Sequence, residues 1–185
     1  MFIAGAVAVL VLAGGAYALW SPRGSGKMVD EAHLRSALQK QFKMDKDKLR
    51  LEIGPDVPGM IVFFAYEMGN PRSNITGVFD GELHTDFDKS IPLVLRALGY
   101  GERDVDPMVV AGAVGKLEGN PGTPFLTQFG IDKSGDPAVM TLPRLVSVDG
   151  QQVVEYWNKT SRETPWRSRV YRKADGTFEV HRGVD

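Results

Sequence analysis

Hydrophobic positions along the chain recur at two spacings, which predict an ordered series of helices and strands. Three segments carry apolar residues on one side of an α-helix, where the repeat is about 3.6 residues. The first helix is expected after Asp30, the second before Gly99, and the third from Asp106-Pro107, because Asp caps helix N-termini and Gly ends helices. Their apolar sides consist of Leu34, Ala37, Leu38 and Phe42, then Ile91, Val94, Leu95 and Leu98, then Val109, Val110, Ala113, Val114 and Leu117.

Other hydrophobic segments have the length and composition of β-strands. Leu49, Leu51 and Ile53 alternate with polar residues, so one side of that strand is expected to face water. Residues 60–66 form a continuous apolar run that predicts a buried central strand, and residues 75–79 predict a third strand. Because Gly and Pro mark the turns, this part of the chain is expected to form an antiparallel meander.

Two Asp-Gly turns in the C-terminal part predict two β-hairpins and select their registers. A two-residue type I′ turn at residues 149–150 brings residues of compatible charge or size opposite each other. At residues 174–176 a three-residue loop with a bulge at Gly176 is expected, because a two-residue loop would pair Arg169 with Arg182. The expected partners are Arg144 with Glu155, Val146 with Val153, Val170 with Val180, Tyr171 with Glu179 and Arg172 with Phe178.

The order of these elements predicts an α+β fold. Strands that are neighbours in sequence are joined by short turns, so antiparallel β-meanders are expected, with the helices packed on one face. Strands and helices do not alternate one by one, so a doubly wound parallel sheet is not expected. Residues 29–185 are expected to form a single globular domain, preceded by an N-terminal hydrophobic helix.

Residues 1–20 contain no charged residue and have the composition of a membrane segment. A helix of this length just spans the apolar part of a bilayer, and Tyr17 and Trp20 stand where aromatic rings favour the headgroup region. The alternative is a cleaved signal peptide, because Ala16-Tyr17-Ala18 matches an A-x-A cleavage site. No Lys or Arg precedes the apolar run, which favours the uncleaved single-pass anchor.

Residues 21–28 follow this segment as a Gly- and Ser-containing tether, so the chain is expected to be membrane-associated. Arg23 and Lys27 lie after the apolar run, and their bias toward the cytoplasmic side is too small to decide the side of the domain.

Overall composition excludes several functional classes. The chain has 22 Lys and Arg against 23 Asp and Glu, which does not fit a strongly basic nucleic-acid-binding protein. It contains no Cys, which excludes disulfide scaffolds, thiol catalysis and Cys-ligated zinc. Its hydrophobic content of 43% and net charge of −1 do not fit a disordered chain.

An acidic stretch at residues 80–88 is the first candidate for chemistry. If the stretch is an extended strand, its alternate residues point to one side and offer oxygen and nitrogen ligands to a cation. The alternative is a solvated face in which Asp86 or Asp88 caps the following helix. The candidate metal ligands are Asp80, Glu82, His84, Asp86 and Asp88.

A basic strand near the C-terminus is the second candidate. The expected register places alternate residues 167–173 on one face, where they can bind anionic groups of lipids or phosphates. The alternatives are a surface for a protein partner and a solvated face whose cations pair with nearby acids. The candidate residues are Arg167, Arg169, Tyr171 and Lys173.

The sequence favours a non-enzymatic binding or assembly module, membrane-anchored or exported, over an enzyme. Membrane contact through residues 1–20 and a protein partner are expected, whereas no cofactor and no specific nucleic acid is. Two alternatives remain: a metal-dependent hydrolase that uses residues 80–88, and an anionic-surface binder that uses residues 166–173. The common nucleotide-binding, nucleophile-elbow and zinc-peptidase motifs do not occur in the sequence.

Overall fold

A computed structural model describes residues 28–119, 130–131, 137–138, 142–158 and 166–183. The predicted membrane segment, residues 1–20, and nearly all of the predicted tether lie outside these ranges. Within them, no helix is long and apolar enough to cross a membrane.

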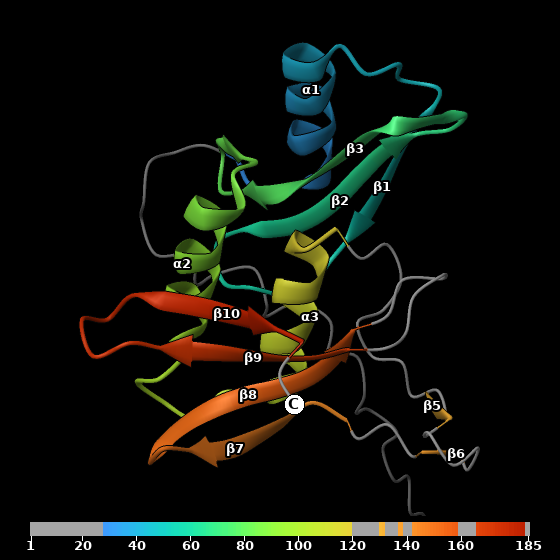
Figure 1. The fold of residues 1–185 in the computed structure, drawn as a ribbon. Helices are drawn as coiled ribbons and strands as arrows, with labels where there is room; N and C mark the ends of the chain where they lie inside the picture. The colour runs from blue at the N-terminus through green and yellow to red at the C-terminus, as the bar shows by residue number, and fades with distance from the viewer. Residues whose placement is uncertain (1–27, 120–129, 132–136, 139–141, 159–165, 184–185) are drawn as a thin grey trace, which may run out of the picture.

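The described part is an α+β structure built mainly from two separate four-stranded antiparallel sheets (Figure 1). The first sheet has the order β1-β2-β3-β4, and the second has the order β10-β9-β8-β7. The helices are α1 (Glu31–Phe42), α2 (Phe87–Leu98) and α3 (Pro107–Leu117). The strands of the first sheet are β1 (Leu49–Ile53), β2 (Ile61–Glu67), β3 (Asn70–Phe79) and β4 (Leu83–His84). Those of the second are β7 (Arg144–Val148), β8 (Gln151–Asn158), β9 (Trp166–Arg172) and β10 (Phe178–Arg182), and β5 (Gly130–Ile131) pairs with β6 (Pro137–Ala138).

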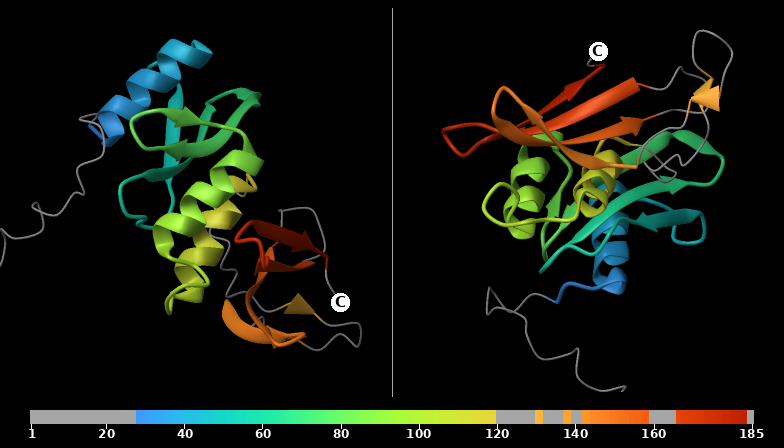
Figure 2. Two further views of the ribbon diagram at one scale, coloured as in Figure 1. Left: turned by 90° about the vertical axis from the view of Figure 1, so that its left-hand side faces the viewer. Right: turned by 90° about the horizontal axis from the view of Figure 1, so that it is seen from below.

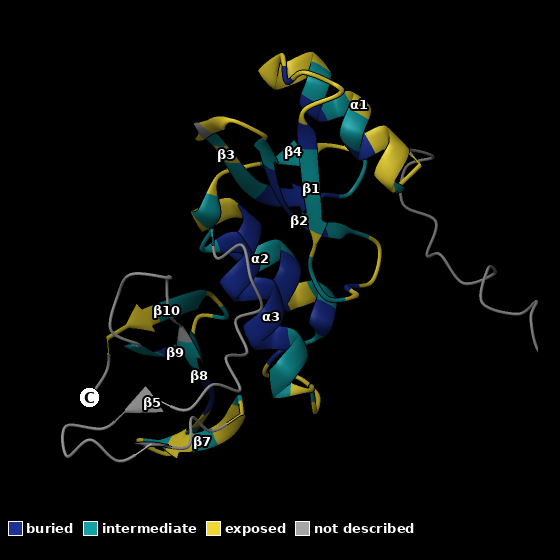
Figure 3. Cartoon of the chain, turned by 90° about the vertical axis from the view of Figure 1, so that its right-hand side faces the viewer, coloured by how far each residue is buried: buried dark blue, intermediate teal, exposed yellow. Residues whose placement is uncertain are grey.

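The elements are stacked in four layers: α1, the first sheet, the pair α2 and α3, and the second sheet (Figure 2). Helix α1 packs on one face of the first sheet through Leu34 and Leu38, which share a hydrophobic cluster with Phe63 and Ala65 of β2. Helices α2 and α3 cover its other face, and the second sheet closes over them in turn. Buried residues are concentrated in α2, α3 and β2 (Figure 3).

The expectation that the helices pack on one face is therefore wrong. The reason lies in β2, which is apolar on both sides: Val62 faces the layer of α2 and α3, whereas Phe63 faces α1. A strand that is apolar on both faces needs cover on both. The expected central buried strand is confirmed, and its two buried faces place α1 opposite the other helices.

Both predicted hairpin registers are confirmed. In the hairpin of β7 and β8, Arg144 lies opposite Glu155, and Asp149 and Gly150 have φ values of 51° and 80°, as a type I′ turn requires. In the hairpin of β9 and β10, Val170 lies opposite Val180. Gly176 has a φ of 80°, which is the left-handed conformation expected for the bulge position.

Tyr100 joins the helical layer to the second sheet. It lies just after α2, and its buried hydroxyl donates a hydrogen bond of 2.6 Å to the Val170 carbonyl and accepts one of 3.1 Å from the Val154 amide. Val154 and Val170 are partners across β8 and β9, and their pair is the last of that ladder. Burial raises the pKa of the Tyr100 hydroxyl, so the group stays protonated and remains a donor at neutral pH. The hydroxyl therefore bridges the two strands at the end of their pairing.

The C-terminal end of α3 makes polar contacts with both sheets. Lys116 forms an ion pair of 3.2 Å with Glu52 of β1, and the Thr76 hydroxyl of β3 donates to the Leu117 carbonyl. Glu118, just after the helix, accepts hydrogen bonds from the Tyr156 hydroxyl of β8 and the Arg182 guanidinium of β10. The carbonyl and charged groups at this helix end are thus satisfied by residues from both sheets.

We expect Tyr100→Phe to lower the free energy of unfolding by about 1–3 kcal/mol, because two buried backbone groups lose their partner. Tyr66→Phe is the matched control, since the Tyr66 ring is only partly buried and should contribute much less through its hydroxyl. Chemical denaturation of the full-length protein in detergent measures both changes. Equal effects of the two substitutions would contradict the bridging role of Tyr100.

Candidate functional site

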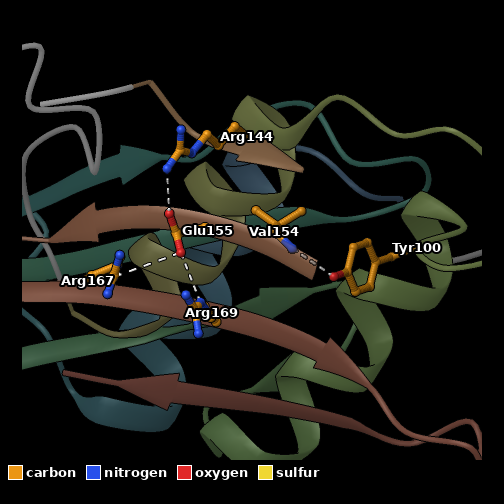
Figure 4. A network of polar contacts seen from close by, with 6 residues as sticks. All are labelled: Tyr100, Arg144, Val154, Glu155, Arg167 and Arg169. Carbon is orange, nitrogen blue, oxygen red and sulfur yellow. Dashed lines mark hydrogen bonds and ion pairs between the residues drawn. The ribbon is translucent and has the colours of Figure 1, made fainter. Parts of the chain in front are cut away.

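Three arginines converge on one buried carboxylate on the outer face of the second sheet (Figure 4). Glu155 lies between Val154 and Tyr156 of β8, both of which belong to the core, so its side chain points away from the helices. Its carboxylate accepts hydrogen bonds from Arg169 Nε at 2.9 Å and Arg144 Nη2 at 3.1 Å. The Nε atom of Arg167 is 3.8 Å from the same carboxylate.

The arrangement follows from strand pairing. Arg144 of β7 and Arg169 of β9 are the register partners of Glu155 on its two sides. Arg167 lies two residues before Arg169 on β9, so both point to the same face of the sheet. The three strands therefore place three cations around one anion.

The electrostatics of Glu155 follow from its surroundings. Its side chain is 5% exposed, and burial alone raises the pKa of the carboxyl. Hydrogen bonds from Arg169 and Arg144, together with the charge of Arg167, outweigh burial, and the pKa lies below its usual value of 4.5. The carboxylate is therefore ionised at neutral pH, and its hydrogen bond in turn raises the pKa of Arg169.

The four residues of the predicted basic surface are divided between two groups. Arg167 and Arg169 belong to the cluster around Glu155. Lys173 lies just after β9 and forms an ion pair of 2.9 Å with Glu179, which also contacts His181 at 3.0 Å. The Tyr171 ring lies against the His181 ring, with 4.6 Å between their centres. Both ends of the basic strand thus contact acids: Lys173 pairs with Glu179, and Arg167 and Arg169 pair with Glu155.

The acidic stretch at residues 80–88 does not form the single extended strand on which its metal site was predicted. Gly81 has a φ of 100° within a bend, β4 is only two residues long, and α2 begins at Phe87. The alternation of side chains therefore breaks twice, and the candidate ligands fall into two separate groups.

Each of these two groups has a local structural role. The Asp80 carboxylate lies 3.1 Å from His84 Nε2 and accepts a hydrogen bond from the Glu82 backbone amide. Asp86 caps α2 by accepting a hydrogen bond of 3.0 Å from the Asp88 amide. All five candidates are described, and among the described residues no three His, Asp or Glu are grouped to hold a metal ion.

An open cleft of about 470 Å³ lies beside the inner side of β7. The connection between α2 and α3 forms one wall, with Arg103 and Val105, and Leu145 of β7 and Gln152 of β8 line the opposite side. Arg103 is held in place by a hydrogen bond of 2.8 Å from its Nε atom to the Leu98 carbonyl. The cleft thus combines apolar and charged lining groups at the margin of the second sheet.

Sequence reasoning missed the central position of Glu155 and the role of Tyr100. The first Asp-Gly turn predicts the pairing of Arg144 with Glu155. It does not predict the pairing of Arg169 with Glu155, because no turn motif fixes the register between β8 and β9. Tyr100 follows a helix stop at Gly99, and nothing local predicts that its hydroxyl reaches the second sheet.

Comparisons with known proteins give no match: no family model, no curated protein and no solved structure is similar to this chain.

We expect Glu155→Gln to lower the free energy of unfolding at neutral pH by about 1–3 kcal/mol, because three guanidinium groups lose their shared carboxylate. The pKa of Glu155 is lowered in the folded state, so the wild-type carboxylate adds stability above about pH 4.5. That contribution is lost as the pH falls through the lowered folded value. Denaturant unfolding from pH 7 to pH 3 should therefore show the two proteins converging in acid.

Glu102→Gln is the control for this comparison. Glu102 is 68% exposed and pairs with Arg172 at 2.8 Å, so its loss should change the stability by less than about 1 kcal/mol. A Glu155→Gln effect that is independent of pH would contradict the electrostatic role of the carboxylate.

Proposed function

We propose that the protein is a non-enzymatic binding module held at a membrane by residues 1–20, and that it binds an acidic segment of a partner protein. The binding surface in this proposal is the outer face of the second sheet around Glu155. One observation carries the proposal: this face lies at the opposite end of the stack of layers from α1, which is the element nearest the predicted tether (Figure 2).

The layers separate the surface from the point where the tether leads into the domain. Helix α1 begins at Glu31, shortly after the predicted tether, and packs on the far side of the first sheet. Packed layers are about 10 Å apart, so three steps between four layers separate the second sheet from α1 by about 30 Å. A partner therefore approaches the surface from the side away from the tether.

The arginines are held in position before any partner arrives. Arg167 and Arg169 are largely covered, and Glu155 holds Arg169 by a hydrogen bond and Arg167 by an ion pair, so little side-chain freedom remains to be lost on binding. Arg144 is 55% exposed and keeps donor groups beyond its hydrogen bond to Glu155. Arg is well suited to bind carboxylates because its planar group donates parallel hydrogen bonds.

The orientation of the surface favours a protein partner over lipid. Lipid headgroups of the anchoring membrane lie on the tether side of the proposed arrangement, whereas the arginines lie on the other side. An acidic protein segment therefore fits the position and the charge of the surface. The anionic-surface binder that uses residues 166–173 becomes, in this proposal, a binder of carboxylates on another protein.

The metal-dependent hydrolase remains the alternative from a different class. Its candidate residues are divided between the bend at Asp80 and the cap at Asp86, so a metal would have to draw them together. Turnover of a substrate by the purified full-length protein at an enzyme-like rate would overturn the binding-module proposal in favour of this alternative.

The anchor is tested by the intact mass of the protein in the membrane and soluble fractions of its expression host. We expect the full mass in the membrane fraction, because residues 1–20 carry no charge and are long enough to span the bilayer core. A soluble protein that lacks residues 1–18 would establish the cleaved signal peptide instead. Protease protection in intact cells then determines the side of the domain.

The surface is tested with a fluorescent Glu- and Asp-rich peptide added to the full-length protein in detergent. We expect saturable binding whose affinity falls steeply with salt, because the attraction is between exposed charges. Arg144→Gln should weaken binding about five-fold or more, since Arg144 is the exposed member of the cluster and its loss leaves Glu155 with two partners.

Arg72→Gln is the matched control, since Arg72 is an exposed arginine of β3 in the first sheet. It should leave the affinity of the peptide unchanged. Equal loss in both variants would indicate attraction to net charge rather than to the Glu155 surface. Binding of phosphatidylserine vesicles in preference to the peptide would show that the surface is a lipid-binding one.

A further inference from the structure

Strand β7 is an exposed edge of the second sheet, and its residues after Arg144 carry no charge. It is the last strand in the order β10-β9-β8-β7, and no described strand pairs with its outer side. After Arg144, whose guanidinium is bound to Glu155, residues 145–148 read Leu-Val-Ser-Val. Leu145 is 42% exposed and Ser147 is exposed as well, and β7 lies at the margin of the molecule (Figure 3).

The other five-residue edge strands of the described part carry at least two charged or ionisable residues each, whereas β7 carries Arg144 alone, at its first position. On the opposite edge of the same sheet, β10 carries Glu179, His181 and Arg182, and the edge strand β1 carries Arg50 and Glu52. Such residues keep sheet edges from pairing with other strands. Strand β7 is therefore the edge that is chemically open to pairing.

The turn geometry shows which backbone groups of β7 face outward. In a hairpin closed by a two-residue loop, the flanking pair Val148 and Gln151 is hydrogen-bonded, and hydrogen-bonded pairs then alternate along the ladder. Leu145 and Ser147 therefore direct their N–H and C=O groups away from β8. The Val154 amide confirms this alternation, because Val154 lies opposite Leu145 and its N–H points to Tyr100 on the other side.

We propose that β7 pairs antiparallel with β7 of a second copy of this chain, with a two-fold axis at Val146. This register places Leu145 opposite Ser147 of the second copy, so the outward N–H and C=O groups form four hydrogen bonds across the axis. The two four-stranded sheets become one continuous sheet of eight strands. The inference goes beyond the proposed function and does not depend on it.

The side chains of β7 complement one another in this register. On the outer face, Val146 meets Val146 of the second copy in a non-hydrogen-bonded pair, the closest kind of cross-strand contact. Arg144 lies opposite Val148 of the second copy, so no like charges meet. On the inner face, Leu145 reaches Leu145 of the second copy diagonally, which covers apolar surface that is exposed in the single chain.

Pro143 argues against registers that extend pairing past the start of β7. Proline has no N–H to donate, and it directly precedes the strand. A register centred on Leu145 would place Pro143 opposite Ser147 and lose hydrogen bonds there. The register centred on Val146 uses both outward-facing residues of the uncharged run and avoids this proline.

Sedimentation velocity of the full-length protein in detergent over a range of concentrations tests the pairing. We expect a reversible dimer, and two variants that weaken it at least about ten-fold. Val146→Lys places two ammonium groups opposite each other at the axis. Ser147→Pro removes an outward N–H and leaves the β7 to β8 ladder intact, because the Ser147 N–H does not face β8.

His181→Lys is the matched control, because it adds a positive charge to the exposed edge strand on the other side of the same sheet. It should leave the dimer unchanged, and residues 1–20 are identical in all four proteins. Circular dichroism and thermal melting confirm that each variant folds.

Three outcomes overturn the proposal. A monomeric wild type at all concentrations would leave the β7 edge to a strand of another protein. A dimer that persists in both Val146→Lys and Ser147→Pro would place the association elsewhere, for example at residues 1–20. A dimer that is lost equally in His181→Lys would show a general effect of charge rather than pairing of β7.

Discussion

The burial of α3 on all sides is the constraint on which the rest of the structure depends. Residues 110–117 are all buried, and the only charged member, Lys116, extends its ammonium group to Glu52 of the first sheet. A helix without a polar side cannot lie on the surface of a single sheet, because its outer half would remain in water. The second sheet covers that half, and α3 contacts β2 and β3 on one side and β7 and β8 on the other.

Much of the local structure could be predicted from the sequence, because it depends on signals within a few residues. The two Asp-Gly turns defined their hairpins, and the alternation of residues around them selected the registers that the structure contains. The arrangement of the layers could not be predicted in this way. The apolar run of β2 indicated a buried strand, but periodicity alone does not say which helix covers which face.

The third helix illustrates the same limit. Its sequence predicts one apolar side, formed by Val109, Val110, Ala113, Val114 and Leu117. The structure also buries Gly112 and Gly115, which lie outside that apolar side. The sequence did contain a signal of burial on both sides of this helix: its second side carries small residues instead of charged ones.

The candidate site was likewise predictable only where it depends on local sequence signals. The cations of β9 were found from their alternation, and the partner of Arg144 was found from the turn. Their convergence on Glu155 depends on the pairing of β8 with β9, and the sequence between these strands contains no Asp-Gly turn motif. Long-range pairing of this kind is specified by the packing of Val154, Tyr156 and Val170 on the helices rather than by any local motif.

The position of Tyr100 also determines where the connection between α2 and α3 can change in length. The part before Tyr100 is fixed, whereas the part after it can vary. Tyr100 is the second residue after α2, so its ring is held at a fixed reach from the helix end, with its hydroxyl between β8 and β9. An extra residue before Tyr100 would withdraw the hydroxyl from the two strands. Residues 101–104 are exposed, so an insertion there would leave Tyr100 in place and would cost only surface contacts, such as the ion pair of Glu102 with Arg172.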